Sequence, residues 1–398
     1  MTDISWRKNL YAIFIAELIV VIGINFVSPF MPLFVQELGN FSNREAALWA
    51  GLATGASGIA MFLSAPFWGI LADRSGRRPM LLRAMFGTAV VVALTGFAPN
   101  VYFLVILRFA MGVLSGTFSA TLALVSTTTP RDKIAFAMAL ISLAKFGGGA
   151  LGPLGGGSLA DNVGFKNTFF ISAAIVLAGG LIVFFFTREK FEQPAQIQAF
   201  SLRNVWRLAI SRQMLPILMV EFALIAGQQM MAPIIPLVIR ELDPGGAAAT
   251  QSGLAFGLMA LIAGVAALVT GRLGGYISLK KILVFSCLAG SVLYLPPIWA
   301  GTATQLVILV ALIGVPKGGL ITSASALIGL SVSQSQQGMA YGVVQSAKAL
   351  GSGLGPLLGG SLAQFLGLRP VFGVAAGFFA LASVLVTKQL AEQPSRRP

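Results

Sequence analysis

The sequence contains no histidine, a single cysteine and few charged residues. The lack of histidine excludes metal sites built on imidazole and acid/base chemistry by histidine. The one cysteine, Cys287, cannot form a disulfide within the chain. Charged residues make up 10% of the 398 positions and hydrophobic residues 56%, and the mean hydropathy is +0.86. Soluble globular domains are far more polar, so the composition predicts a protein embedded in a lipid bilayer.

Long apolar runs take the place of the missing charge. Two of them are LYAIFIAELIVVIGINFV at 10–27 and FFISAAIVLAGGLIVFFF at 169–186, each close to the ~20 residues with which an α-helix crosses ~30 Å of hydrocarbon. The first run is too long for a secretory signal peptide and lacks a small-residue cleavage site, so we expect it to stay in the mature protein. Twelve membrane-spanning helices are predicted, at roughly 9–35, 47–72, 79–97, 101–128, 133–160, 167–187, 213–239, 250–272, 279–300, 304–332, 337–365 and 369–388.

The net charge of +14 follows the predicted topology. Of the 27 Lys and Arg residues, four lie well within predicted spans, four on the odd-numbered loops or the span ends beside them, and 19 on the termini, the even-numbered loops or the span ends beside these. Because basic residues accumulate in short cytoplasmic loops, we expect an integral protein of a plasma or inner membrane with both termini in the cytoplasm. Topology accounts for the charge, so a nucleic-acid partner is not expected. The expected partners are the lipid bilayer and a small-molecule substrate, for a chain that acts as a monomer.

The two halves of the chain repeat each other. Residues 134–169 and 337–372 agree at 15 of 36 positions, and the shift of 203 places Lys348 on Lys145. A second match, at a shift of 204, places Glu221 on Glu17. Because each half has six helices, an even number, both halves begin on the same side of the membrane. The repeat therefore predicts a pseudo-two-fold axis along the membrane normal and a site between the halves.

The repeat divides the chain into a six-helix bundle over 1–187, a cytoplasmic linker over 188–212 and a second six-helix bundle over 213–398. Within the linker, Arg203, Arg207 and Arg212 alternate with apolar residues. This pattern is typical of an amphipathic helix on the membrane surface, and a plain tether is the alternative.

Three motifs lie in the N-terminal half. They are GILADRSGRRPML at 69–81, LRFAMG at 107–112 and LAKFGGGALGPLGGGSLA at 143–160. On these motifs the chain resembles the major facilitator superfamily over its entire length, and the third resembles the fifth-helix signature of the drug:proton antiporter branch. The resemblance implies an all-α membrane protein with twelve transmembrane helices in two pseudo-symmetric six-helix bundles. We find no pairing of nucleophile and base, so we expect a transporter rather than an enzyme, with the proton as coupling ion and no other cofactor or metal.

The first motif is implied to latch the two halves together in one state, and a topology-fixing loop is the alternative. Its residues are Gly69, Asp73, Arg74, Gly76, Arg77 and Arg78. The equivalent loop of the second half has Gly275 where the first has Asp73, which predicts a one-sided latch.

Glycine and proline in the third motif predict close helix packing that permits bending or sliding, with ordinary tight packing as the alternative. The residues concerned are Gly148, Gly152, Pro153 and Gly156, with Gly351, Gly355, Pro356 and Gly359 in the repeat.

Six charged residues fall well within the predicted spans, away from their ends: Glu17, Arg108, Lys145, Glu221, Lys317 and Lys348. A charge facing lipid at a helix centre costs roughly 2.5–3.5 kcal/mol, so each should face a partner or a wet cavity. Two interpretations stay open: the carboxylates and lysines form ion pairs that hold helices together, or the carboxylates carry protons during transport. For the second we predict Glu17 and Glu221 as proton-coupling residues, with Arg108 added because the resemblance implies it.

Polar residues on the same helices are candidates for substrate binding: Asn25, Lys145, Gln228, Gln229, Lys317, Gln345 and Lys348. From the resemblance we expect a proton-coupled antiporter that works by alternating access and exports lipophilic or amphipathic compounds, as multidrug efflux transporters do. The six intramembrane charges sum to +2, which leaves a proton-coupled transporter of an anionic or zwitterionic metabolite as an alternative. A lipid flippase or scramblase is a further alternative.

Overall fold

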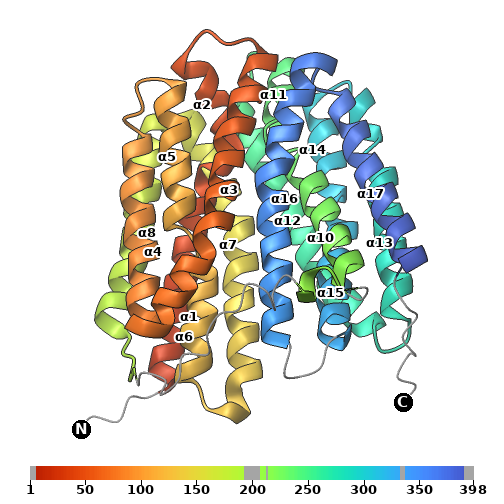
Figure 1. Ribbon diagram of the computed structural model, residues 1–398. Coiled ribbons are helices and arrows are strands. Elements are labelled where there is room, and N and C mark those ends of the chain that lie inside the picture. The colour runs from red at the N-terminus through yellow and green to blue at the C-terminus, as the bar shows by residue number, and fades with distance from the viewer. Residues whose placement is uncertain (1–5, 192–206, 212–213, 332–336, 390–398) are drawn as a thin grey trace.

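The computed structural model describes residues 6–191, 207–211, 214–331 and 337–389, and every regular element among them is helical. Ten helical segments in this part of the chain are long and apolar enough to cross a membrane. The other two predicted spans, 213–239 and 337–365, contain the shorter apolar helix α10 (Met214–Gln229) and the long helix α16 (Gln337–Leu366). Helix α1 (Trp6–Phe26) begins and α17 (Pro370–Gln389) ends on the same side of the molecule (Figure 1), which we name the cytoplasmic side after the charge pattern.

The helices form two groups that follow the sequence repeat (Figure 1). The first group consists of α1, η1 (Ser28–Phe30), α2 (Met31–Leu38), α3 (Asn43–Ser75), α4 (Arg77–Thr95), α5 (Val101–Leu114), α6 (Thr117–Thr128), η2 (Arg131–Lys133), α7 (Ile134–Val163) and α8 (Phe165–Phe186). The second consists of α10, α11 (Ile235–Leu242), α12 (Ala248–Leu273), α13 (Leu279–Leu293), η3 (Pro296–Trp299), α14 (Ala303–Leu312), α15 (Gly314–Ser331), α16 and α17.

The linker between the groups is described only at its ends. Residues 192–206 and 212–213 lie outside the described residues, and with them most of the predicted amphipathic helix, including Arg203 and Arg212. Leu208 packs against a small apolar cluster of Met214, Ile217 and Val344 at the cytoplasmic ends of α10 and α16.

Four expected spans are each divided into two helical pieces. Pro29 and Pro32 follow the end of α1, and Pro233 and Pro236 occupy the equivalent positions after α10. Both helices are interrupted there because proline lacks the N–H group that a continuing helix needs. The expected single helix at 101–128 is two helices, α5 and α6, joined through Gly116 with φ of +108°. Its repeat at 304–332 is likewise α14 and α15. Such interrupted helices bring backbone polar groups and side chains to the depth at which transporters hold their substrates.

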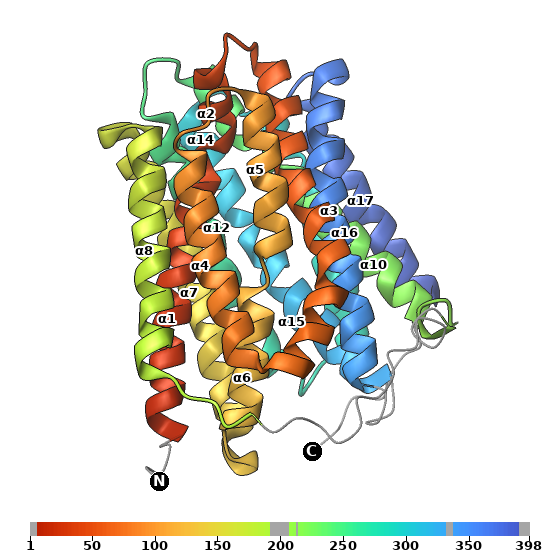
Figure 2. The same cartoon turned by 60° about the vertical axis from the view of Figure 1, so that its left-hand side comes forward.

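The two groups touch along two seams, α3 with α16 and α7 with α12, the first of which is visible in Figures 1 and 2. At the first seam Gly55 and Gly58 of α3 face Gly353 of α16, and at the second Gly253 of α12 faces Pro153 of α7. Each of these residues lies in the half of its helix that is farther from the cytoplasmic side. The structure is therefore closed on the side expected to face outward.

Hydrogen bonds between the groups lie on that outer side too. Asp161, near the end of α7, accepts hydrogen bonds from the backbone N–H (2.7 Å) and the hydroxyl (2.6 Å) of Thr250 in the first turn of α12. A carboxylate at this place also interacts favourably with the positive end of the α12 dipole. Asn43 of α3 donates to Glu241 of α11 at 3.1 Å. These contacts join the two halves across the outer face.

Candidate functional site

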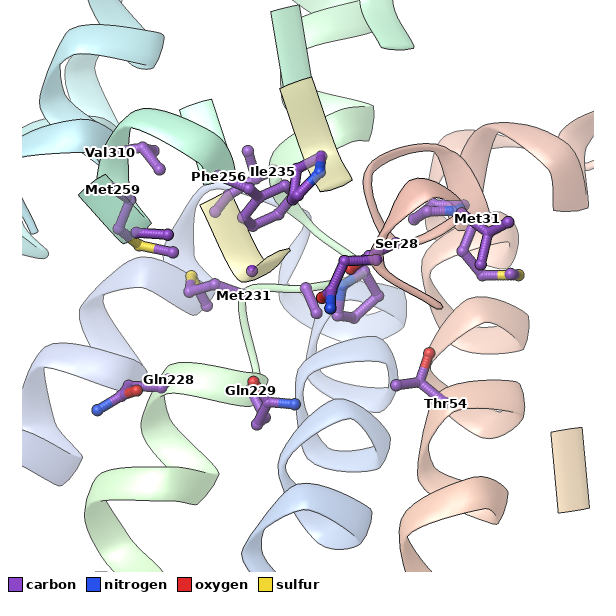
Figure 3. Close-up of a pocket in the computed structure, with 18 of the residues that line it drawn as sticks. Ser28, Met31, Thr54, Gln228, Gln229, Met231, Ile235, Phe256, Met259 and Val310 are labelled. Carbon is purple, nitrogen blue, oxygen red and sulfur yellow. The ribbon is translucent and has the colours of Figure 1, made fainter. Parts of the chain in front are cut away.

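A cavity of about 300 Å³ lies between the two halves, bounded by the broken helices and by α3, α7 and α12. Figure 3 shows Gln228 and Gln229 at the end of α10, with Thr54 of α3 on another wall. Apolar residues complete the lining, and those labelled in the figure are Met31, Met231, Ile235, Phe256, Met259 and Val310. The volume is at the small end of the ~300–1,000 Å³ range of small-molecule sites, and methionine and aromatic walls adapt to ligands of different shape.

Arg108 and Lys317 are the charged residues that line this cavity, and no acidic residue is among the lining residues. The guanidinium of Arg108 lies 3.4 Å from the Met111 sulfur and 3.6 Å from the Met31 sulfur, which are weak acceptors. Its Nε atom is buried with no hydrogen-bond partner among the described residues. Within that part of the chain no carboxylate forms an ion pair with either cation. The cavity thus carries two positive charges that the described residues do not neutralise.

Glu17 lies fully buried between α1 and α6, outside the cavity lining. The hydroxyl of Thr121 donates a 2.6 Å hydrogen bond to its Oε2 atom, and its Oε1 atom has no hydrogen-bond partner among the described residues. Lys145 forms no ion pair with this carboxylate within 4.0 Å, although the charges of the two residues interact. Its Nζ atom lies 4.0 Å from the centre of the Phe118 ring, a cation–π contact.

Glu221 has a different partner in the second half. It is 5% exposed, and Lys348 places Nζ 3.3 Å from its Oε1 atom. Ser323, which corresponds to Thr121 at a shift of 202, donates instead to the Gly319 carbonyl of its own helix at 2.6 Å. The same shift places Leu320 on Phe118, so the C-terminal lysine has no ring to occupy. The repeat therefore keeps the residue types and changes their pairing.

The structure brings five of the predicted proton-coupling and substrate-binding residues to the cavity: Asn25, Arg108, Gln228, Gln229 and Lys317. The side-chain amide of Asn25 donates a 2.8 Å hydrogen bond to the Val21 carbonyl of its own helix. Glu17, Lys145, Glu221 and Lys348 lie outside the lining, and Gln345 is exposed on α16. Sequence reasoning missed Thr54, Phe256, Met259 and Tyr294, because no charge or motif distinguishes the cavity face of their helices.

The loop between α3 and α4 is bonded to its own half. Gly76 adopts φ of +94°, and the backbone N–H groups of Arg77 and Arg78 donate to the Glu189 carboxylate at 3.0 and 2.7 Å. The side chain of Arg78 also donates to the Phe184 carbonyl at 2.6 Å. Glu189, which the sequence analysis did not single out, thus caps α4. A Cβ atom added to the predicted latch residue Gly69 would meet nothing within 4 Å, Arg74 forms no hydrogen bond or ion pair with a described residue, and the side chain of Asp73 lies outside the described residues.

The glycine and proline motifs bring helix backbones together. Gly148, Gly152 and Gly156 of α7 lie against α1, and added Cβ atoms would meet Val21, Asn25 and Phe26. The repeated residues Gly351, Gly355 and Gly359 of α16 lie against α10 and the turn after it. The prolines of both motifs turn their carbonyls toward the other half, Pro153 to Gly253 and Pro356 to Gly51. Helices α7 and α16 are therefore packed on both sides, within their own half and across the seam.

The chain is similar to known membrane transporters. The sequence model described as Major Facilitator Superfamily matches residues 13–245 and 217–398. Multidrug resistance protein MdtG of Citrobacter koseri is 34% identical over 381 residues, covering 94% of this chain and 93% of that protein, and MdtG of Salmonella arizonae gives the same values.

Solved structures give the same fold. A bacterial homolog of the human lysosomal transporter Spinster, in an inward-facing and occupied conformation, has a TM-score of 0.81 with 13% identity and 98% coverage of both chains. The human organic anion transporter MFSD10 has a TM-score of 0.72 with 19% identity, covering 96% of this chain and 100% of that one.

Proposed function

Because the chain belongs to the major facilitator superfamily, we propose that it is a proton-coupled antiporter that exports lipophilic or amphipathic small molecules by alternating access. Relatives that are 34% identical over nearly the whole chain are named multidrug resistance proteins, which supports the substrate class. The thioether and aromatic walls of the central cavity suit ligands of varied shape. The closed outer side of the structure corresponds to a state loaded from the cytoplasm.

The observation that carries proton coupling is the state of Glu17. It is a fully buried carboxylate with one oxygen bonded to Thr121 and the other without a hydrogen-bond partner among the described residues. A buried carboxylate without an ion-pair partner is stable in its protonated form, and it ionises when water or a cation reaches it. Rearrangement of α1 against α6 between the two states of the transporter supplies that change. We assign the coupling proton to Glu17.

Glu221 and Arg108 have other roles in this proposal and do not carry the coupling proton. Lys348 holds Glu221 in an ion pair, which favours a structural role between α10 and α16. Arg108 stands in the cavity wall and affects the substrate through its charge.

A transport assay tests the proposal. In inside-out vesicles with an imposed proton gradient, uptake of a lipophilic fluorescent dye should release protons from the vesicle interior. The variant Glu17→Gln should lower gradient-driven uptake at least about tenfold, and Glu221→Gln, its repeat-related control, should retain most of it. Normal gradient-driven uptake by Glu17→Gln would contradict the assignment, and lipid transfer without any pH dependence would favour a flippase.

The charge of the cavity favours a second candidate, a proton-coupled transporter of anionic or zwitterionic organic molecules. Arg108 and Lys317 line the cavity with no acidic residue beside them. Two cations in a desolvated site attract a carboxylate or phosphonate strongly. If this candidate is correct, an amphipathic carboxylate should bind at least about tenfold more tightly than its methyl ester, and Lys317→Gln should remove the difference. Equal binding of the carboxylate and its methyl ester would contradict this second candidate function.

A further inference from the structure

A second hollow, of about 820 Å³, lies on the opposite side of α12 and α15 from the central cavity. Its walls are α12 from Leu261 to Leu273 and α13 from Lys281 to Ala289, and its floor is formed by Val315, Pro316 and Gly319 of α15. The twelve steps from Leu261 to Leu273, at about 1.5 Å each, span roughly 18 Å, close to half of the ~30 Å hydrocarbon thickness. The groove therefore extends from the cytoplasmic surface to mid-membrane, along one leaflet.

In the N-terminal half, side chains fill the position that corresponds to this groove. Gly112 packs on Ser57 and Ala60, and at a shift of 202 Gly314 packs on Met259 and Ile262. The identical contacts show that this shift superimposes the two halves here.

At the same shift, Thr270 takes the position of Trp68 and Phe285 that of Arg83. The indole N–H of Trp68 donates to the Val113 carbonyl at 2.6 Å, and the Arg83 guanidinium stacks 3.5 Å from the ring centre. In the second half a threonine replaces the indole, and Phe285 is 70% exposed rather than folded inward. The groove is the space that the tryptophan and arginine occupy in the other half.

The groove is not uniformly apolar. The hydroxyls of Thr270 and Ser286 line it, and neither makes a hydrogen bond with a described residue. A Cβ atom added to Gly319 would press on the Ser286 hydroxyl, so this glycine lets α13 pack closely against α15 at the floor of the groove. Thr270 is one turn from the cytoplasmic end of α12. A ligand with acceptor oxygens just below the membrane surface would satisfy these donors.

The rim and the mouth of the groove indicate which ligand fits. Val265 and Phe285 on the rim are more than 60% exposed and face the hydrocarbon of the membrane. Lys281 stands at the cytoplasmic mouth. Basic residues at this depth attract the anionic headgroups of the inner leaflet.

We propose that the groove binds an acidic phospholipid of the cytoplasmic leaflet, with one acyl chain between α12 and α13, the ester oxygens at Thr270 and Ser286, and the phosphate at Lys281. The site is separate from the central cavity and does not depend on what the protein transports. Since α12 also forms the seam with α7, bound lipid braces the helix that moves when the outer side opens.

Native mass spectrometry of the purified full-length protein tests the site. With phosphatidylglycerol and phosphatidylcholine of identical acyl chains, the wild type should retain one phosphatidylglycerol in preference to phosphatidylcholine by about fivefold, the effect of one lysine at the surface. Lys281→Ala should bind both lipids equally. Thr270→Trp places an indole where the N-terminal half has Trp68, so this variant should lose the bound lipid. Leu268→Trp, at a 74% exposed position of the same helix, should keep it. Unchanged retention by Thr270→Trp, or equal retention of the two lipids by the wild type, would overturn the proposal.

A labelling experiment on the wild type needs no variant. Phosphatidylglycerol with a diazirine in one acyl chain is photolysed in the complex, and the adducts are mapped by peptide sequencing. Adducts should concentrate in residues 261–289 and around Pro316. Adducts spread evenly over the lipid-facing helices, or absent from these residues, would overturn the proposal.

Discussion

The ammonium nitrogen of Lys348 lies 3.3 Å from a carboxylate oxygen of Glu221, and this ion pair has no counterpart between Glu17 and Lys145 among the described residues. The sequence repeat relates the two acids and the two lysines, yet the N-terminal acid is bonded to Thr121 and the N-terminal lysine to the face of Phe118. The two halves are therefore chemically unequal at positions that the sequence repeat relates. Glu221 pairs with a cation, whereas Glu17 accepts a hydrogen bond from a hydroxyl group.

The ion pair should contribute to stability. Removing one member of a fully buried pair costs about 3–5 kcal/mol. Because the Lys348 side chain is 28% exposed, water reaches the pair, and we expect about 2 kcal/mol for Lys348→Ala, well below the range for a dry pair. Thermal unfolding in detergent should show a loss of several degrees. Lys145→Ala, which loses a cation–π contact of about 0.5–2 kcal/mol, is the matched control with a smaller shift. Adding Glu221→Gln to Lys348→Ala should restore part of the lost stability, and no recovery would argue against the pair.

The Asp161–Thr250 contact should hold the outer side closed. Losing a helix cap costs about 1–2 kcal/mol, so Asp161→Ala should lower the ratio of outer-closed to outer-open molecules by about 5- to 30-fold. Spin labels at the exposed outer positions 99 and 245, in a Cys287→Ser background, report the opening as a longer distance. Asn162→Ala, one residue along the same helix, should leave the distances unchanged. An unchanged distribution in Asp161→Ala would show that the seams close the outer side without this contact.

The glycine seam should resist added volume. A Cβ at Gly253 would collide with the Pro153 carbonyl of α7, whereas at Gly264 of the same helix there is nothing within 4 Å. Overpacking costs about 1–3 kcal/mol, so Gly253→Ala should shift the same pair of labels toward the open distance. Gly264→Ala should not. Identical behaviour of the two variants would mean that the seam is looser than the structure shows.

Much of the architecture could be predicted from the sequence, because the hydropathy and charge of a segment depend only on the residues within it. The apolar runs predicted the all-helical fold, and the matching Gly152 and Gly355 motifs predicted two related halves. The breaks at Gly116 and Ile313 were missed, because the mean hydropathy of a span is the same whether the span is one long helix or two short ones.

The site was harder to predict than the fold. The repeat places Lys348 on Lys145 and Glu221 on Glu17, which suggested two symmetric pairs, but the difference between the halves depends on residues that carry no charge. Phe118 against Leu320, and Thr121 against Ser323, decide which lysine meets its acid. The cavity residues Thr54 and Met259 became visible only when the rotation of α3 and α12 about their axes was known.

Counting protons tests the central claim most directly. When a saturating substrate is added to purified protein in weakly buffered detergent solution, the wild type should release about one proton per molecule bound, from Glu17. Glu221→Gln should release the same amount, and Glu17→Gln should release none while still binding substrate. Equal proton release by Glu17→Gln and the wild type would contradict the assignment of the coupling proton to Glu17.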